Sequence, residues 1–186
     1  MTGMTETAEA ETRMREALDA LGHSFPERAV EVRRLLEQGG FTAEEAARSV
    51  RFGWGRPGGV PDGYPTFGGT ARPLSPLLSA RFRLAGTLND LAWKFPTAAR
   101  VGSVHRSRAV RDAYRAHAEN WAGSAPMRLS ADRLSIAAII SAEDGSVAYF
   151  VWSDAIEPEV LAYAEGHERR HRDLAAFLEW LGGPQE

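Results

Sequence analysis

The stretch from Leu134 to Trp152, LSIAAIISAEDGSVAYFVW, decides the fold class of this chain. Two apolar runs flank the pair Asp144-Gly145, and an Asp-Gly pair in this position is the strongest short-range signal for a β-hairpin. In the second run, the residues at 147, 149 and 151 alternate with those at 148, 150 and 152, and both sets are apolar. The alternation predicts a strand that is covered on both faces.

The segment after the hairpin is compatible with two secondary structures, a strand or a helix. Glu159 to Ala164 predicts a third strand, but the apolar positions from 160 to 171 also fit one helix running from Pro158 to Leu181. We predict a strand, a turn at Gly166 and then a helix, because a glycine inside a helix costs about 1 kcal/mol relative to alanine. The expected fold class is α+β, with an antiparallel sheet, a C-terminal helix packed on it and an N-terminal group of short helices.

The N-terminal third predicts short helices after a disordered tail, residues 1–11. Within the helical segment, residues 12–51, Gly22 is expected to end a first helix. Ser24 and Thr42 are each followed three positions later by a glutamate, which is the capping-box pattern at the start of a helix. Three short helices are therefore expected before residue 52.

Residues 52–79 form a separate segment, in which seven Gly and five Pro fall within 28 positions. Neither a helix nor a central strand tolerates that density, so a long loop is expected, with short edge strands at most. The remaining residues, 80–186, are expected to form the α+β domain. Inside it, the pattern predicts a short strand at 81–84, a helix at 87–95 and a second helix at 107–121.

The composition excludes several classes of protein. The 186 residues include no cysteine, which excludes disulfide scaffolds, thiolate metal sites and cysteine nucleophiles. Residues 1–13 are polar and acidic and lack the apolar core of a signal peptide. No stretch approaches the roughly 18 uninterrupted apolar residues of a membrane span. We therefore expect a cytoplasmic protein without a membrane partner.

Charge is distributed unevenly along the chain, whose net charge is −3. Residues 81–115 carry eight basic groups against two acidic ones, a net of +6, whereas residues 116–186 carry five against twelve, a net of −7. A near-neutral chain is not typical of general nucleic-acid binders. A regulatory or nucleic-acid-associated domain that uses the basic run from Arg100 to Arg115 is one alternative, although such a run more often solvates an exposed face.

The residues from His167 to His171 match H-E-x-x-H, the pattern of zinc metalloproteases. On a helix, the two histidines would share a face and hold Zn²⁺, while Glu168 would act as general base on a metal-bound water. Gly166 directly before the motif, two arginines inside it and the lack of an obvious third ligand favour a polar entry to the last helix instead. A small zinc-dependent hydrolase is the alternative function, and the main expectation includes no metal and no cofactor.

From about Leu134 to Leu181 the chain resembles the C-terminal part of the SMI1/KNR4 (SUKH) superfamily. The similarity lies in a strand at 146–154, a second strand at 159–163 and a closing helix at 173–181. The family's usual N-terminal motif, an apolar helix that leads into a Leu-Pro-x-x-Tyr-like turn, is not found. The nearest match is the segment 60–64, which reads VPDGY.

The resemblance implies a non-catalytic protein-binding module, frequently an immunity protein that neutralises a toxin. An acidic C-terminal region could meet a basic toxin domain, with charge complementarity speeding the encounter. Aromatic side chains are the anchors that interfaces commonly use. We therefore expect the partner to contact a surface formed by Glu157, Glu159, Glu165, Trp152, Trp54 and Tyr64.

Overall fold

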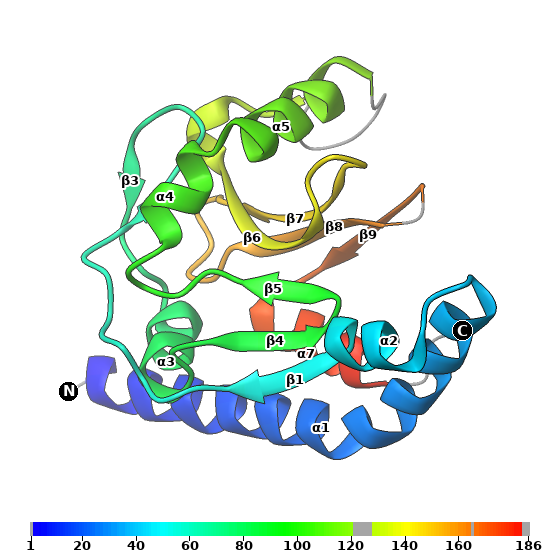
Figure 1. Cartoon of the computed structure of the whole chain (residues 1–186). Coiled ribbons are helices and arrows are strands. Elements are labelled where there is room, and N and C mark those ends of the chain that lie inside the picture. The colour runs from blue at the N-terminus through cyan, green and yellow to red at the C-terminus, as the bar shows by residue number, and fades with distance from the viewer. Residues whose placement is uncertain (1, 121–127, 165, 184–186) are drawn as a thin grey trace.

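Helices cover both faces of an antiparallel β-sheet (Figure 1). The structure, a computed structural model, describes residues 2–120, 128–164 and 166–183. The helices are α1 (Thr2–Gln38), α2 (Ala43–Ser49), α3 (Pro76–Leu84), α4 (Val101–Arg106), α5 (Arg108–Asn120) and α7 (Leu174–Gly182), with a 3-10 turn η1 (Ala131–Arg133). The long helix α1 packs along α3 and α7 on one side of the sheet, and α4 and α5 lie on the other. The expected α+β class is confirmed.

Seven strands form the sheet in the order β1-β4-β5-β6-β7-β8-β9, and every neighbouring pair is antiparallel. They are β1 (Arg51–Trp54), β4 (Leu88–Leu91), β5 (Trp93–Phe95), β6 (Leu134–Ser141), β7 (Ser146–Val151), β8 (Glu159–Ala164) and β9 (His167–His171). A separate ribbon pairs β2 (Tyr64–Pro65) with β3 (Ala71–Arg72). Strands β5 and β6 are joined only by the pair Lys94 and Ile139, so the sheet has a three-stranded and a four-stranded part.

The hairpin predicted at Asp144-Gly145 is confirmed as β6 and β7, and Gly145 takes a φ of 80° in the turn. Alternate residues of β7 enter two different cores. The even-numbered residues from 148 to 152 belong to a core shared with α1, α3 and α7. The odd-numbered residues from 147 to 151 belong to a second core below α4 and α5. Both faces of this strand are therefore covered, as its apolar alternation predicts.

The N-terminal third differs from the expectation of a disordered tail and short helices. One helix, α1, includes residues 5–11 and continues through Gly22 to Gln38. Ala10 and Met14 are buried, so the expected tail contributes to the core. Gly22 does not end the helix, because it lies where β1 approaches α1. A Cβ there would lie 3.1 Å from the Phe52 ring, so the glycine permits close packing.

The two predicted capping boxes have different outcomes. Ser24 lies inside α1, and its hydroxyl donates to the Leu21 carbonyl at 3.2 Å, so the first box is wrong. Thr42 caps α2 as predicted, since its side chain accepts from the Glu45 N–H and the Glu45 carboxylate accepts from the Thr42 N–H. The helix α1 ends before Gly40, which takes a φ of 94°.

Residues 52–79 contain short strands, as the sequence allows: most of the outer strand β1 and both strands of the β2–β3 ribbon lie there. The helix α3 was not expected, and because it begins at Pro76, the expected boundary between residues 79 and 80 falls inside a helix. The Ser75 hydroxyl accepts from the Leu78 N–H at 3.3 Å, and proline fits the first turn of a helix. These start signals explain why residues 81–84 are helical and do not form the expected strand.

Residues 87–95 form the β4–β5 hairpin and not the expected helix. In β4, Leu88 and Asp90 are both fully buried. Burial of every second residue is the pattern of a strand with one covered face. The carboxylate of Asp90 is compensated by Arg28 of α1, whose Nη1 and Nη2 donate to its two oxygens at 2.8 and 2.7 Å. Because bidentate pairs of this kind are strong and geometrically specific, the pair ties α1 to β4.

The C-terminal segment confirms the predicted strand at 159–164, which is β8, and Gly166 takes a φ of 77° in the turn after it. A continuous helix from 158 to 181 is thus ruled out. The chain forms the further strand β9 before α7, whereas a helix was expected directly after the turn. Asp173 then caps α7 by accepting from the Ala176 N–H at 2.9 Å.

Candidate partner-binding surface

Two of the expected aromatic anchors, Tyr64 and Trp152, lie in the core and are not available to a partner. Tyr64 is 1% exposed, and its hydroxyl donates to the Ile136 carbonyl at 2.8 Å. Trp152 is 7% exposed, and its indole N–H donates to the Ser135 hydroxyl at 2.8 Å. Both side chains satisfy their polar atoms inside the protein, which makes their burial favourable.

Trp54 is the expected anchor that does reach the surface, with an exposure of 37%. It lies on the outer strand β1 and packs edge-on against Phe52, which in turn stacks on Phe25 of α1. Four strands separate β1 from β8 in the sheet order, which corresponds to about 24 Å. Trp54 and Glu159 of β8 therefore do not belong to one contact patch.

The three expected acidic residues have different environments. Glu157 is half-buried, and its Oε1 accepts from the Leu77 N–H at 2.8 Å, in the first turn of α3. Burial raises the pKa of Glu157, although its hydrogen bonds act in the opposite direction. Glu159 lies 3.5 Å from Arg170 in a partly exposed ion pair. Glu165 lies outside the described residues.

The β7–β8 loop, residues 152–158, presents Ile156, which is 68% exposed and is the most exposed of the large hydrophobic side chains described. Both ends of the loop are held in place. At the first end, the Trp152 N–H donates to the Arg133 carbonyl and the Arg133 Nε donates to the Trp152 carbonyl, both at 2.8 Å. At the second end, Glu157 is bound to α3. The fold thus holds an aliphatic side chain in solvent.

Polar groups surround Ile156 in this loop. Asp154 is exposed, and the Ser153 hydroxyl accepts from the Ala155 N–H at 3.1 Å, which shapes the turn. An apolar centre with a polar rim is the usual anatomy of a protein interface. Ile156 is not among the residues that the sequence predicts for the partner surface. The available signal was a large aliphatic residue inside a short turn that also contains Ser153, Asp154 and Glu157.

The H-E-x-x-H residues lie on the strand β9 and not on a helix. Positions four apart on a strand are separated by about 13 Å, so His167 and His171 cannot hold one ion as they would on a helix. The His171 ring packs against Phe177, and Glu168 accepts from the Tyr163 hydroxyl at 2.9 Å. Among the described residues, no group of three or more His, Asp or Glu side chains could hold a metal ion. The helical zinc site proposed for this motif is therefore wrong.

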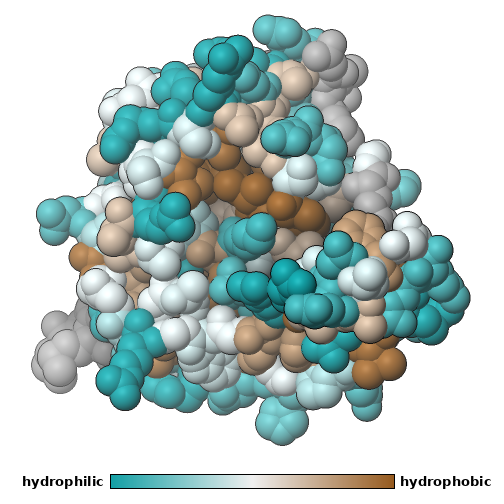
Figure 2. Space-filling view, viewed as in Figure 1, coloured by the Kyte–Doolittle hydropathy of each residue, from teal (hydrophilic) through white to brown (hydrophobic). Residues whose placement is uncertain are grey.

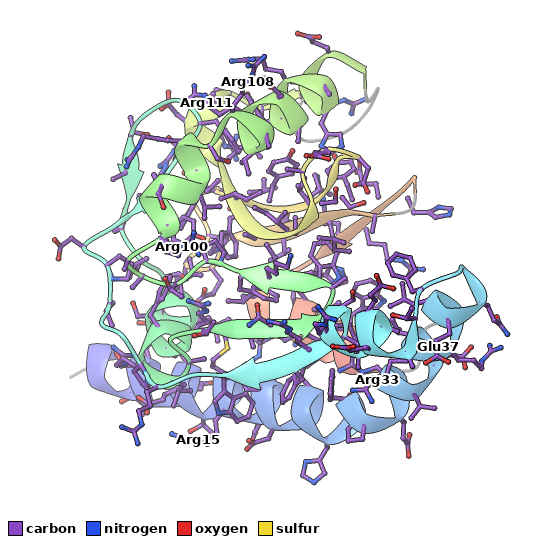
Figure 3. The ribbon with its side chains drawn as sticks, viewed as in Figure 1. Arg15, Arg33, Glu37, Arg100, Arg108 and Arg111 are labelled. Carbon is purple, nitrogen blue, oxygen red and sulfur yellow. The ribbon has the colours of Figure 1, made fainter. Side chains whose placement is uncertain are left out.

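The basic run at 100–115 forms the outer face of α4 and α5. Figure 3 shows Arg108 and Arg111 pointing away from the sheet, with Arg100 at the start of α4. Arg108 lies 3.4 Å from Asp112, whereas Arg100 and Arg111 form no ion pair with any residue that the structure describes. The outer face of these two helices is therefore basic.

His105 belongs to the same run but points into the core. It is 3% exposed, and its ring centroid lies 4.3 Å from that of Phe67. Burial, together with the charges of Arg111 and Arg106, lowers the pKa of His105 to about 4. His105 is therefore neutral at physiological pH and adds no charge to the basic face.

A groove of about 810 Å³ separates α5 from the tip of the β6–β7 hairpin. Alanines of α5 and Ala142 form its apolar wall, and its rim carries Arg108 opposite Glu143 and Asp144. In the space-filling view, hydrophobic surface lies in a hollow below α5 (Figure 2). Because both signs of charge line the rim, the groove does not favour a ligand of one charge.

Comparison with protein-family models, curated proteins and solved structures finds no match for this chain. Within the described ranges, none of the helices combines the length and the apolar character needed to cross a bilayer. The function of the chain has to be argued from its own surfaces.

Proposed function

We propose that this chain is a non-catalytic protein-binding module, similar to SUKH proteins, that acts as an immunity protein against a basic toxin domain. The resemblance over residues 134–181 supports it, and β7, β8 and α7 follow one another there with only β9 inserted. Tyr64, the last residue of the nearest match to the family's N-terminal motif, packs against Phe150 and Trp152 of the same region. The two segments that carry the resemblance are thus neighbours in the fold.

The observation that carries the proposal is the exposure of Ile156 in a loop that is bonded at both ends. A large aliphatic side chain held in water gains free energy when a partner covers it. Because the loop is already ordered, little conformational entropy is lost on binding. These two features are those of a binding hot spot.

The charge around the loop suits a basic partner. Asp154 is exposed, and Glu159 is only loosely paired with Arg170 at 3.5 Å. Exposed carboxylates attract a cationic surface from a distance and raise the association rate, and salt screens that attraction. In this proposal Ile156 holds the complex together, while the carboxylates speed its formation.

The test is to measure binding kinetics with the partner that the wild-type protein captures. Ile156→Asp should raise the dissociation rate at least 10-fold, because it removes the apolar anchor and would bury a charge. Val30→Asp is the matched control, since Val30 is a β-branched residue with an exposure of 65% on α1. It should leave both rate constants close to those of the wild type.

The charged rim is tested by the double reversal Asp154→Lys with Glu159→Lys, measured over a salt series. The reversal should slow association several-fold at low salt and have little effect at high salt. Equal effects of the Ile156 and Val30 variants would exclude the loop as the contact surface. Greater sensitivity to reversal of Arg100 and Arg111 would instead indicate an acidic partner on the α4–α5 face.

A further inference from the structure

Arg81 of α3 is a buried charge without a counter-charge. It is 2% exposed, and its two terminal nitrogens, Nη1 and Nη2, are shielded from solvent and have no hydrogen-bond partner among the residues that the structure describes. The plane of the guanidinium group lies near the Phe82 ring, with Cζ 4.4 Å from the ring centroid. Arg28 shows the usual arrangement, because both oxygens of Asp90 accept from its guanidinium group.

The guanidinium group of Arg81 stays charged. Burial lowers its pKa to about 10, which still leaves the group protonated at neutral pH. The titratable neighbour is Tyr64, whose pKa is raised by burial and whose hydroxyl donates to the Ile136 carbonyl. Tyr64 is therefore neutral and does not supply a negative charge. An unpaired buried charge is strongly unfavourable, so the site requires a compensating group.

Arg81 lines a small cavity among buried residues. The volume of the cavity is about 10 Å³, which leaves room for no more than one small particle. Arg81 lines it together with Tyr64, Phe82 and Phe150, and all four of these residues are buried. A positive charge therefore faces a small space with room for a single small particle.

The cavity lies at the junction between the two parts of the sheet. It is lined by Phe95 of β5 and by Ala137 of β6, two strands that share only the pair Lys94 and Ile139. Ala137 falls in the register shift of β6 and has no cross-strand partner in β7. The cavity thus lies where the strand pairing is interrupted. Arg81 lines it from α3, which packs on this face of the sheet.

We propose that this cavity binds one monovalent anion of the size of chloride, held by Nη1 and Nη2 of Arg81. A water molecule could accept the two hydrogen bonds, but it would leave the positive charge uncompensated. A halide ion provides an acceptor and the opposite charge at once. Polyatomic anions such as phosphate do not fit a space this small. The site is separate from the β7–β8 loop and does not depend on the proposed protein partner.

The test is thermal unfolding in mixtures of sodium chloride and sodium gluconate at constant ionic strength, since gluconate is too large for the cavity. A ligand that binds only the native state stabilises it by mass action. The folding equilibrium constant of the wild type should therefore rise about 100-fold when the chloride concentration exceeds the dissociation constant 100-fold. Bromide should have the same effect as chloride.

Two variants test whether Arg81 is the residue through which chloride stabilises the protein. Arg81→Met removes the charge and keeps an unbranched side chain, so the variant should fold and should be insensitive to the exchange of chloride for gluconate. Arg83→Met is the matched control on the same helix, because Arg83 is exposed and should not contribute to the cavity. It should retain the response of the wild type.

A crystal of the wild type grown in bromide gives a direct result that does not depend on the folding of any variant. An anomalous peak within hydrogen-bonding distance of the Arg81 nitrogens is expected. A wild type that is equally stable in chloride and gluconate, with no such peak, would overturn the proposal. Loss of the chloride response in Arg83→Met as well would also overturn it, because the response would then arise from surface charge.

Discussion

The β7–β8 loop and the α4–α5 pair are both charged surfaces, but their charges serve different purposes. In the loop, Glu157 binds the first turn of α3, and the most exposed side chain is the aliphatic Ile156. In the helical pair, Val101 and Val110 are buried, and arginines form the outer face. None of the strongly exposed large hydrophobic residues in the described part of the chain lies on α4 or α5.

The difference shows that the net charge of a segment does not locate a binding surface. A carboxylate that caps a helix is not available to a partner, and an arginine-rich face without an apolar centre provides attraction but little lasting affinity. An exposed aliphatic side chain in an ordered loop has the opposite properties. The two regions therefore differ in what they expose: the loop presents an aliphatic side chain, whereas the helical pair presents arginines over a buried apolar face.

The largest effect is expected when the helical pair is detached from the sheet. Phe67 is 6% exposed, and its ring stacks on Tyr114 at 4.2 Å and lies 4.3 Å from His105. Phe67→Ala should cost about 3–5 kcal/mol of unfolding free energy, because the ring leaves a cavity between both helices and the sheet. Phe41→Ala, at a residue that is 49% exposed, should cost under about 1 kcal/mol. Denaturant unfolding of both variants checks this pair.

The same variant can show whether the helical pair and the β7–β8 loop are independent parts of the fold. In Phe67→Ala, amide hydrogen exchange should increase over α4 and α5 and remain unchanged in the β7–β8 loop. A uniform increase over both regions would mean that the two surfaces are not independent parts of the fold.

A smaller effect is expected from pH in the helical pair. The pKa of His105 is about 4 in the folded protein, below the unperturbed value of about 6.5. The unfolded state therefore binds the proton first, and the stability contributed by neutral His105 is lost as the pH falls from about 6.5 to 4. The loss should be on the order of 3 kcal/mol for this residue.

His105→Phe isolates this contribution, because it keeps an aromatic ring beside Phe67 and cannot take up a proton. Unfolding free energies measured between pH 7 and pH 4 should fall less steeply in this variant than in the wild type. The exposed residue His23 provides the control variant His23→Gln. Parallel pH profiles for the wild type and His105→Phe would contradict the buried, neutral state of His105.

The smallest effect is expected at the attachment of the loop to α3. Glu157→Ala leaves the Leu77 N–H without its acceptor and should cost about 1–2 kcal/mol of unfolding free energy. Glu157→Gln keeps an oxygen acceptor and should cost less. Glu159→Ala removes only a partly exposed ion pair and should cost under about 1 kcal/mol. Equal costs for Glu157→Ala and Glu159→Ala, measured by urea unfolding, would show that Glu157 does not hold the loop in place.

Much of the four-stranded part of the sheet could be predicted from sequence, because its signals are local. The Asp144-Gly145 turn and the alternation in β7 determine the hairpin, and the turn at Gly166 separates β8 from β9. The three-stranded part could not be predicted, because β4 buries a charge. Asp90 is polar in the sequence and is buried only because Arg28, 62 positions away, pairs with it.

The N-terminal helix and the candidate surface were missed for related reasons. Gly22 is a typical helix stop signal, but it lies inside α1, where the Phe52 ring leaves little space for a Cβ. Tyr64 and Trp152 are residue types that interfaces often use as anchors, but their polar atoms donate hydrogen bonds to acceptors in the core. Ile156 is of a residue type that is usually buried, but it is exposed. For Gly22, Tyr64 and Trp152, a contact with a residue distant in sequence decides the environment, and no local pattern indicates it.

The central claim is that a protein partner contacts the β7–β8 loop, and amide hydrogen exchange of the free protein and of its complex with the captured partner tests it most directly. The amides of residues 152–157 should exchange more slowly in the complex, while those of α4 and α5 should be unchanged. Slower exchange over residues 100–115 with an unchanged loop would contradict the claim and would place the partner on the basic face.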